Sequence, residues 1–311
     1  MQRFETAGPV RLIVKNASGT VRVCARGAAG SEVEVRPLGL GAEEQVARTR
    51  VECTEDGESR RLLVDVPQAR HLPRLGNHGV EVVVSVPAGS SFDIATASAD
   101  VVGEGRCAGG SVRTMSGDVE WELAEGELAV ETASGDVRVR DALGGLAARS
   151  ASGDLEVRST HGRLALDTQS GDCEVGRAEA EAAVSTSSGD IRVDSFGGPY
   201  EVRTASGDVS IARTAAGGRI ESSSGDIRLG SVESGRTRAA SASGDITVAV
   251  LAGRSVAVDA VTRSGHLESD IPLSDERPPG VAEGREVQLE LRTSSGDIRI
   301  HRSGAAAAPR T

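Results

Sequence analysis

The residues whose spacing first suggests chemistry are aspartates that each close a repeated Ser-Gly-Asp step. The first seven recur with a fixed 18-residue period, Asp245 follows one position late, and a degenerate Ser264-Gly265-His266 and then Asp297 come at longer steps. The members are Asp118, Asp136, Asp154, Asp172, Asp190, Asp208, Asp226, Asp245 and Asp297, with the degenerate Ser98-Ala99-Asp100 one period upstream. A row of carboxylates at fixed spacing is a candidate calcium site, because calcium prefers oxygen ligands.

The period, however, differs from that of known calcium-binding repeats. Calcium-binding β-rolls use nine-residue repeats that offer several glycine carbonyls to each ion, whereas this chain offers a single Asp in a repeat of twice that length. We therefore expect a structural turn ladder, in which each Asp accepts amide hydrogen bonds at its own turn. We expect no bound metal or cofactor, and calcium stays as the alternative.

The sequence offers little else on which an enzyme could be built. Glycoside cleavage needs two carboxylates about 5–9 Å apart, usually beside aromatic platforms, yet aromatic residues make up 2% of the chain. Trp121 falls in a column of valines, so we expect it in the core. The remaining candidate ligands show no close pair: His71, His78, His161, His266, His301, Cys24, Cys53, Cys107 and Cys173. We expect no catalytic residues and no enzyme activity, with a polysaccharide-acting β-helix as the least favoured alternative.

The elements around each Asp repeat as faithfully as the Asp itself. Apolar residues stand one and three positions after it and six before it, as at Val137, Val139 and Val130 around Asp136. Apolar residues two apart indicate strands, so each unit predicts two short strands that meet at Ser-Gly-Asp. A Thr or Ser four before each Asp predicts an inward ladder of hydroxyls, hydrogen-bonded between coils.

A unit of this length is too short to bury its own apolar face, and stacking it on similar neighbours provides a shared core. The outward columns support parallel stacking in register, because opposite charges recur one period apart, as at Arg113 and Glu131. An antiparallel meander could also use Gly-Asp turns but would not need the fixed period. The sequence thus predicts an all-β fold, a parallel β-solenoid (single-stranded β-helix) with 18-residue coils and a β-rich N-terminal cap.

The expected organisation has three parts. Residues 1–90 form the cap, continuous with the solenoid, with strand-like runs and a short helix at Ala42–Arg50. Residues 91–302 form the solenoid, in which an insertion at Pro272–Gly284 precedes a final unit at Leu289–Ile300. Residues 303–311 form a disordered tail. An open last coil would be an unpaired edge, so the ends need covering.

Composition limits the partners. The formal net charge of −11 argues against nucleic acid, and no apolar run approaches the 18 or so residues of a membrane segment. No secretion signal is evident at Met1–Thr6, so the expected location is the cytoplasm.

The chain resembles a known family through its opening, Phe4 to Val35 with Asn-Ala-Ser-Gly-Thr-Val-Arg-Val, and through its serial Ser-Gly-Asp-Val/Ile-x-Val units. Both are similar to the bacterial DUF4097 β-strand-repeat proteins, which are often labelled adhesins. The resemblance implies a parallel β-solenoid with no established catalytic activity. Together with the columns, it predicts a non-enzymatic scaffold or protein-interaction module that binds a protein partner or itself, with a surface adhesin-like protein as the alternative.

Overall fold

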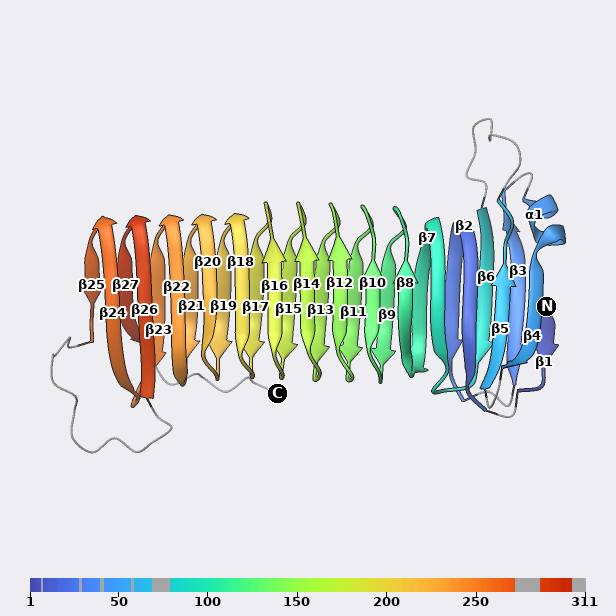
Figure 1. The fold of residues 1–311 in the computed structure, drawn as a ribbon, viewed down its shortest axis with the longest axis horizontal. Coiled ribbons are helices and arrows are strands. Elements are labelled where there is room, and N and C mark those ends of the chain that lie inside the picture. Colours follow the sequence, from blue (N-terminus) through green and yellow to red (C-terminus); the bar gives the residue numbers. More distant parts are fainter. Residues whose placement is uncertain are drawn as a thin grey trace. The chain divides into compact units, whose positions relative to one another are not determined.

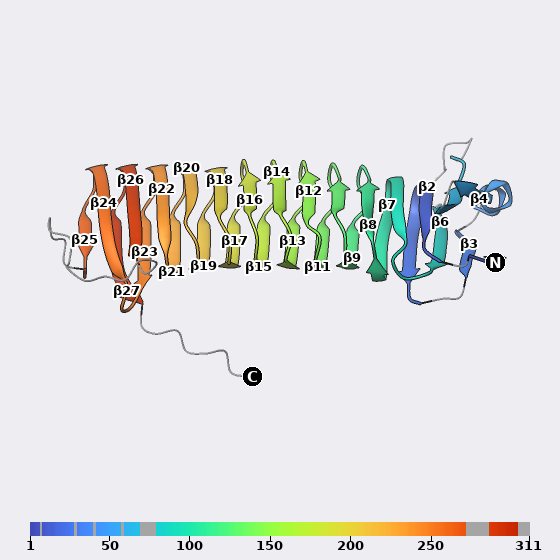
Figure 2. The ribbon, with the colours of Figure 1, turned by 60° about the horizontal axis from the view of Figure 1, so that its bottom comes forward.

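The structure, a computed structural model, describes residues 1–6, 8–27, 30–39, 42–56, 59–68, 79–271 and 286–303. His71, His78, the predicted insertion Pro272–Gly284 and the predicted tail from residue 304 onward lie outside these ranges. The chain divides into two compact units, Met1–Gly162 and Arg163–Thr311. In both units the dominant pattern is short parallel strands stacked coil on coil (Figures 1 and 2).

Unit 1 contains three regular coils of two strands each, stacked in chain order. These are β8 (Gly109–Arg113) with β9 (Val119–Ala124), β10 (Leu128–Glu131) with β11 (Val137–Ala142), and β12 (Leu146–Ser150) with β13 (Leu155–Thr160). They continue on β7 (Ser91–Cys107), a single long strand whose halves pair with β8 and β9.

The N-terminal part of unit 1 does not stack in chain order. The first coil, β2 (Val10–Ala25), pairs along one edge with β7. Along its other edge it pairs with β5 (Ser59–Asp65) and β6 (Gly79–Val86), which together make an outer coil. β2 is therefore threaded one coil inside the stack, although it precedes β5, β6 and β7 in the chain.

Antiparallel strands then cover the outer coil of unit 1. β3 (Ser31–Leu38) pairs with β6, and β4 (Arg50–Asp56) pairs with β5. The short β1 (Gln2–Phe4) pairs with β3. The helix α1 (Glu43–Arg48) lies within the range predicted to be helical.

Unit 2 contains five two-strand coils in chain order. They are β14 (Leu164–Thr168) with β15 (Cys173–Ala178), β16 (Ala182–Thr186) with β17 (Ile191–Phe196), β18 (Tyr200–Ser206) with β19 (Val209–Thr214), β20 (Gly218–Ser224) with β21 (Ile227–Val232), and β22 (Gly235–Ser243) with β23 (Ile246–Leu251). Partners on successive coils are at first separated by one sequence period, as Leu164 is from Ala182. The predicted all-β parallel solenoid with 18-residue coils is confirmed.

The end of unit 2 departs from the expected order. The last coil, β26 (Glu286–Ser295) with β27 (Ile298–Ser303), pairs directly with β22 and β23. The terminal coil, β24 (Ser255–Ser264) with β25 (Leu267–Ser269), precedes it in the chain but stacks outside it (Figure 1). The predicted final unit of the chain, Leu289–Ile300, is present as β26 with β27, but it lies one coil inside the stack and not at its end.

The interior of each unit is narrow and mostly aliphatic, with a local aromatic stack. In unit 1 the rings of Phe92 and Trp121 stack with centroids 4.0 Å apart, and Trp121 is 2% exposed, as expected of a core residue. Gly103 provides the space, because a Cβ there would lie 2.4 Å from the indole. The aromatic side chains are thus accommodated by a missing side chain on the neighbouring coil.

Candidate functional site

The aspartates of the repeated turn form a continuous hydrogen-bonded row within each unit, which we call the aspartate ladder. In each link the backbone N–H of one Asp donates to Oδ1 of the Asp on the neighbouring coil, as from Asp136 to Asp118 at 2.9 Å. The other links run from Asp118 to Asp100 and Asp154 to Asp136 in unit 1, and in unit 2 from Asp190 to Asp172, Asp208 to Asp190, Asp226 to Asp208, Asp245 to Asp226 and Asp297 to Asp245, all at 2.8–3.1 Å. The expectation that each carboxylate accepts amides from its own turn was wrong, since these bonds join successive coils.

In unit 2, arginine side chains form ion pairs with Oδ2, the second carboxylate oxygen of each ladder aspartate. Arg228 lies 3.1 Å from Oδ2 of Asp208 and 2.6 Å from Oδ2 of Asp226, so it bridges two consecutive rungs. Arg192 bridges Asp172 and Asp190 at 3.7 and 2.8 Å. In unit 2 an arginine therefore stands two positions after the Asp on every second coil, and each of these arginines pairs with two consecutive aspartates of the ladder.

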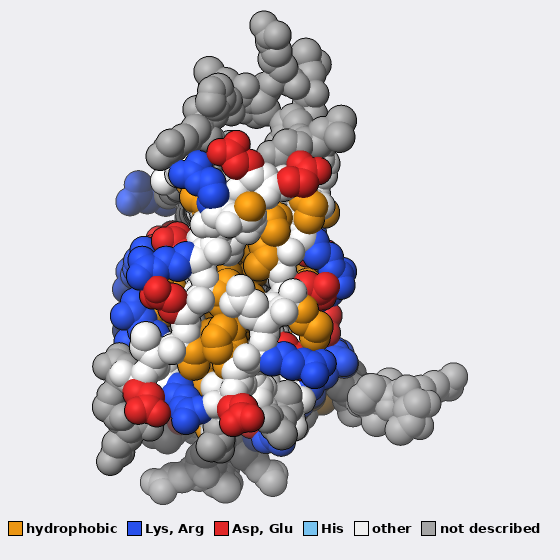
Figure 3. Space-filling view, turned by 90° about the vertical axis from the view of Figure 1, so that its right-hand side faces the viewer, with side chains coloured by type: hydrophobic (Ala, Val, Ile, Leu, Met, Phe, Trp, Pro, Cys, Tyr) orange, Lys and Arg blue, Asp and Glu red, His pale blue; other side chains and the backbone are white. Residues whose placement is uncertain are grey.

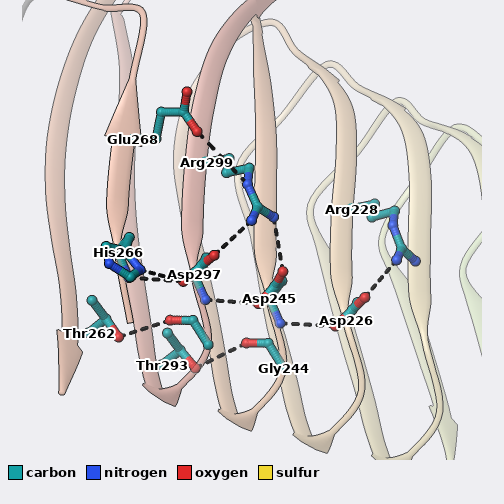
Figure 4. A network of polar contacts seen from close by, with 11 residues as sticks. Asp226, Arg228, Gly244, Asp245, Thr262, His266, Glu268, Thr293, Asp297 and Arg299 are labelled. Carbon is teal, nitrogen blue, oxygen red and sulfur yellow. Dashed lines mark hydrogen bonds and ion pairs between the residues drawn. The ribbon is translucent and has the colours of Figure 1, made fainter. Parts of the chain in front are cut away.

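The last coil keeps this alternation only because it is threaded inside. Arg299 bridges Asp245 and Asp297 at 2.9 and 2.7 Å (Figure 4). If the coils were stacked in chain order, Glu268 and not Arg299 would follow the coil of Asp245. The charge pattern of the ladder thus agrees with the threaded order.

These contacts change the acidity of the ladder. The backbone N–H of Asp226, followed by Arg228, lowers the pKa of Asp208 below its ordinary value. The backbone N–H of Asp297 and the guanidinium of Arg299 do the same to Asp245. Hydrogen bonds to the charged form of a carboxylate favour that form, so these two rungs stay ionised and take part in the scaffold.

The ladder ends at a histidine on the terminal coil. The backbone N–H of His266 donates to Oδ1 of Asp297 at 2.9 Å, and its ring Nδ1 lies 3.5 Å from the same oxygen (Figure 4). The ladder link needs only a backbone N–H from this residue. An Asp here would add another carboxylate to the acidic row, which the histidine avoids.

The hydroxyl column predicted from the sequence lies inside, and it stabilises the turn. In the coil of Thr186, the hydroxyl oxygen accepts the backbone N–H of Gly189 at 3.1 Å within its own turn. The same hydroxyl donates to the carbonyl of Gly171 on the preceding coil at 3.1 Å. The predicted bond between coils is present, together with a bond within the turn that was not predicted.

The other sequence candidates are scattered. Within the described ranges, no three His, Cys, Asp or Glu side chains are grouped as metal ligands would be. Burial raises the pKa of the Cys107 thiol to about 12, so it stays protonated at neutral pH. His161 and His301 lie on separate units. Calcium binding by the ladder stays an untested alternative.

Sequence reasoning expected an open last coil to be an unpaired edge, but it did not predict that the outermost coil would be β24 with β25. In the part of the chain that the structure describes, no strand pairs with the outer side of β24 or β25. Leu267 continues an inward apolar column and is 45% exposed, whereas its partner Ile298 one coil inside is 0% exposed. The long spacing before Asp297 was the available signal, since it allows a chain to double back.

The unit 1 end is built differently. Seen end-on, hydrophobic side chains run down its middle, with charged side chains toward its margins (Figure 3). β3 and β4 contribute half-buried side chains there, among them Val35, Val51 and Cys53. No helix in the described ranges is long and apolar enough to cross a membrane.

Comparison with known proteins gives a family and a set of distant likenesses. The Toastrack DUF4097 family matches residues 77–201 and, overlapping them, 140–301. No curated protein matches the chain. Solved structures that match over nearly all of both chains include a putative cell adhesion protein from Clostridium sporogenes, with 9% identity, a TM-score of 0.24 and 97% of each chain covered.

Two other solved structures are similar at the same level. A putative adhesin from Bacteroides fragilis is 10% identical with a TM-score of 0.31, covering 97% of this chain and 95% of that one. A putative lipid binding protein from Parabacteroides distasonis is 13% identical with a TM-score of 0.25, covering 97% and 96%. The family match, which spans well over half of the residues, carries the assignment: the chain belongs to the Toastrack DUF4097 family.

Proposed function

We propose that the protein is a non-enzymatic scaffold, a protein-interaction module whose regular outer walls bind a protein partner. The observation that carries the proposal is the use of the repeated charges. The ladder carboxylates hold coils together and the outward charges form ordered rows, so the repeat maintains a surface of fixed spacing.

The clearest such surface is a set of paired charges on β18, β20, β22 and β26 of unit 2, which we call the charged wall. Its members are Glu201, Arg203, Arg219, Glu221, Arg236, Arg238 and Glu290. Arg203 lies 3.3 Å from Glu221 on the next coil, and Arg238 lies 2.6 Å from Glu290. Surface pairs of this kind contribute little to stability, about 0–1 kcal/mol each, so their order suits recognition better than folding.

The acidity of the carboxylates supports a structural role over a hydrolytic one. A glycosidase needs a carboxylic acid whose pKa is raised so that it can donate a proton. The hydrogen bond from Arg219 lowers the pKa of Glu221, and the backbone N–H of Gly105 lowers that of Glu122. With Asp208, Asp245 and Glu290, these are carboxylates held in the charged form.

The test compares partner capture by matched full-length chains. A variant with Arg203→Glu, Arg219→Glu and Arg238→Glu reverses the charged wall, and one with Arg113→Glu, Arg140→Glu and Arg149→Glu makes the same charge change in unit 1. We expect a partner that co-purifies with the native chain to be lost from the first variant and kept by the second, with both melting curves near native.

Two results would contradict the proposal. One is release of reducing ends when the purified chain is incubated with a panel of polysaccharides. The other is a native partner that binds both variants equally well. Binding of the purified chain to intact cells would instead favour the adhesin-like alternative.

A further inference from the structure

The terminal coil of unit 2 carries an unpaired strand edge with an incompletely covered core. β24 has ten residues and pairs on one side with β26, and within the described residues nothing pairs with its other side. Every second N–H and C=O of a strand points to each edge, so the outer edge can receive another strand.

The apolar columns of the solenoid stop abruptly at this coil. Val287, Leu289 and Leu291 of the last coil are 0–1% exposed. Their partners on β24, Val256, Val258 and Ala260, are half-buried. Burial of apolar surface is the main favourable term in association, so this edge has both backbone groups and core side chains for a partner to cover.

The outward residues of β24 are arranged symmetrically about one apolar side chain. Val261 is 50% exposed, with Asp259 two residues before it and Arg263 two residues after it, both exposed. In an antiparallel pair of identical strands centred on Val261, each Asp259 lies opposite the Arg263 of the other copy. No like charges face each other in that register.

From this charge symmetry we infer that the protein forms a two-fold dimer through the outer edge of β24, antiparallel and centred on Val261. The occupant of the open edge is a second copy of the chain. The inference specifies one partner of the proposed scaffold and rests on that proposal. The two can fail separately, because dimerisation is measured on the purified chain alone.

A two-fold contact is favoured over a head-to-tail filament by the construction of the unit 1 end. There β5 and β6 are paired with the antiparallel strands β4 and β3, and the edge that β3 and β4 leave runs antiparallel to the coils, so a coil of another copy cannot continue the parallel stack on it. A strand edge that meets its own copy uses the same surface twice and closes. The expected assembly therefore stops at two chains.

Charge exchange tests the pairing. Asp259→Arg and Arg263→Asp, made singly in the full chain, each place like charges opposite one another at two symmetric positions, and the double variant restores opposite charges. Sedimentation velocity across a concentration series should show a dimer for the native chain. We expect a dissociation constant at least about tenfold weaker for each single variant and near-native dimerisation for the double variant.

The matched controls are Asp194→Arg and Arg213→Asp, which make the same charge changes at exposed positions on β17 and β19. Both should remain dimeric. Asp259 also forms an ion pair within its own chain, 3.8 Å from Arg292, and the rescue experiment separates this pair from the contact between copies. The double variant does not restore that pair, so its recovery reports the contact between copies.

A cross-link gives a second measurement that does not depend on charge. With Val261→Cys the two sulfurs face each other at the two-fold axis, within the Cα separation of 4.4–6.8 Å usual for disulfides. With Ala257→Cys the two positions are displaced by eight residues, about 27 Å. We expect an oxidised dimer from the first variant and none from the second.

Several outcomes would overturn the inference. These are a native chain that stays monomeric to about 100 μM, an open-ended series of larger species, or single charge variants that dimerise normally. Dimerisation that arises only when residues 272–285 are replaced by a Gly-Ser linker would also overturn it, because the chain's own segment would then be the occupant.

Discussion

The N-terminal part of unit 1 and the C-terminal part of unit 2 both thread one coil inside its neighbours, and they differ in how the outermost coil is covered. In unit 1 the first coil, β2, lies between β7 and the outer coil of β5 and β6. In unit 2 the last coil, β26 with β27, lies between β22 with β23 and the terminal coil. In both, a coil close to one end of the chain is threaded inside and paired on two edges, which keeps it from fraying.

The difference lies in what covers the outermost parallel coil. In unit 1, Leu62, Val64, Val82 and Val84 of the outer coil are 0% exposed beneath antiparallel neighbours. In unit 2, within the described residues, the corresponding inward side chains of the terminal coil are half-buried or exposed. In unit 1 the antiparallel strands bury the outermost parallel coil and take the half-buried positions themselves, whereas in unit 2 the half-buried side chains belong to the outermost parallel coil, whose edge is open to a partner.

The largest expected effect concerns the stacking order of β22, β26 and β24, because a disulfide between two of these strands either forms or does not form. Ala240→Cys with Arg292→Cys joins directly opposed positions on β22 and β26, about 4.8 Å apart and within disulfide range. Ala240→Cys with Val261→Cys spans two strand spacings. We expect oxidation at submicromolar protein to link the first pair within one chain and not the second, as mapped by peptide mass spectrometry. The reverse result would restore chain-order stacking.

The second largest effect is expected when one core side chain is truncated in the outermost parallel coil of each unit and the losses in free energy of unfolding are compared. Leu62→Ala removes a fully buried side chain from the outer coil of unit 1, and we expect a loss of about 2–5 kcal/mol in the free energy of unfolding. Leu267→Ala, in the terminal coil, removes a side chain that is 45% exposed, with an expected loss below about 1 kcal/mol. Urea unfolding with hydrogen exchange at submicromolar chain measures both. Equal losses would mean that the terminal coil is covered after all.

Turn glycines provide a matched pair with the same local clash. A Cβ at Gly207 would lie 2.0 Å from the carbonyl oxygen of Gly189, and one at Gly265 would lie 2.0 Å from that of Gly296. Gly207 lies on a coil with neighbours on both sides, so Gly207→Ala should cost about 1–3 kcal/mol. Gly265 lies on the terminal coil, which can move outward, and Gly265→Ala should cost less. Thermal melts compare the two, and a larger loss at Gly265 would contradict the open edge.

Much of the fold follows from the repeat alone. The 18-residue columns predicted parallel strands and their register, because Val137 and Leu155 occupy the same column and prove to be direct partners. They also predicted opposite charges on successive coils, as found between Arg113 and Glu131 at 3.2 Å. Local pattern is sufficient wherever the coil next in space is also next in sequence.

The threaded ends were not predicted, and the reason is physical. Every coil presents the same apolar columns, so Leu267 and Ile298 are equally good neighbours for Ile246. Stacking order is then decided by connection lengths and by the outward charges. The arginine two residues after Asp on alternate coils contained this information, since Arg299 completes the alternation only when it follows Asp245.

The smallest expected effect concerns one rung of the ladder and its dependence on pH. Asp245→Asn keeps an oxygen that accepts the backbone N–H of Asp297 but loses the charge that pairs with Arg299. The side chain is 39% exposed, so we expect a loss of about 0.5–1 kcal/mol near neutral pH. Urea unfolding of the native and variant chains from pH 7 to pH 2 measures it.

The pH dependence fixes the cause of that loss. Because the pKa of Asp245 is lowered on folding, its contribution is fully present above the ordinary aspartate pKa of about 3.9. It is then lost as the pH falls through the lowered folded value, so the native and Asp245→Asn curves should converge in acid. Asp297→Asn serves as the comparison, because it removes the other carboxylate that pairs with Arg299, and the link that its Oδ1 accepts comes from the backbone N–H of His266 on the terminal coil. A gap for Asp245→Asn that persisted at pH 2 would show that the lost interaction is packing and not charge.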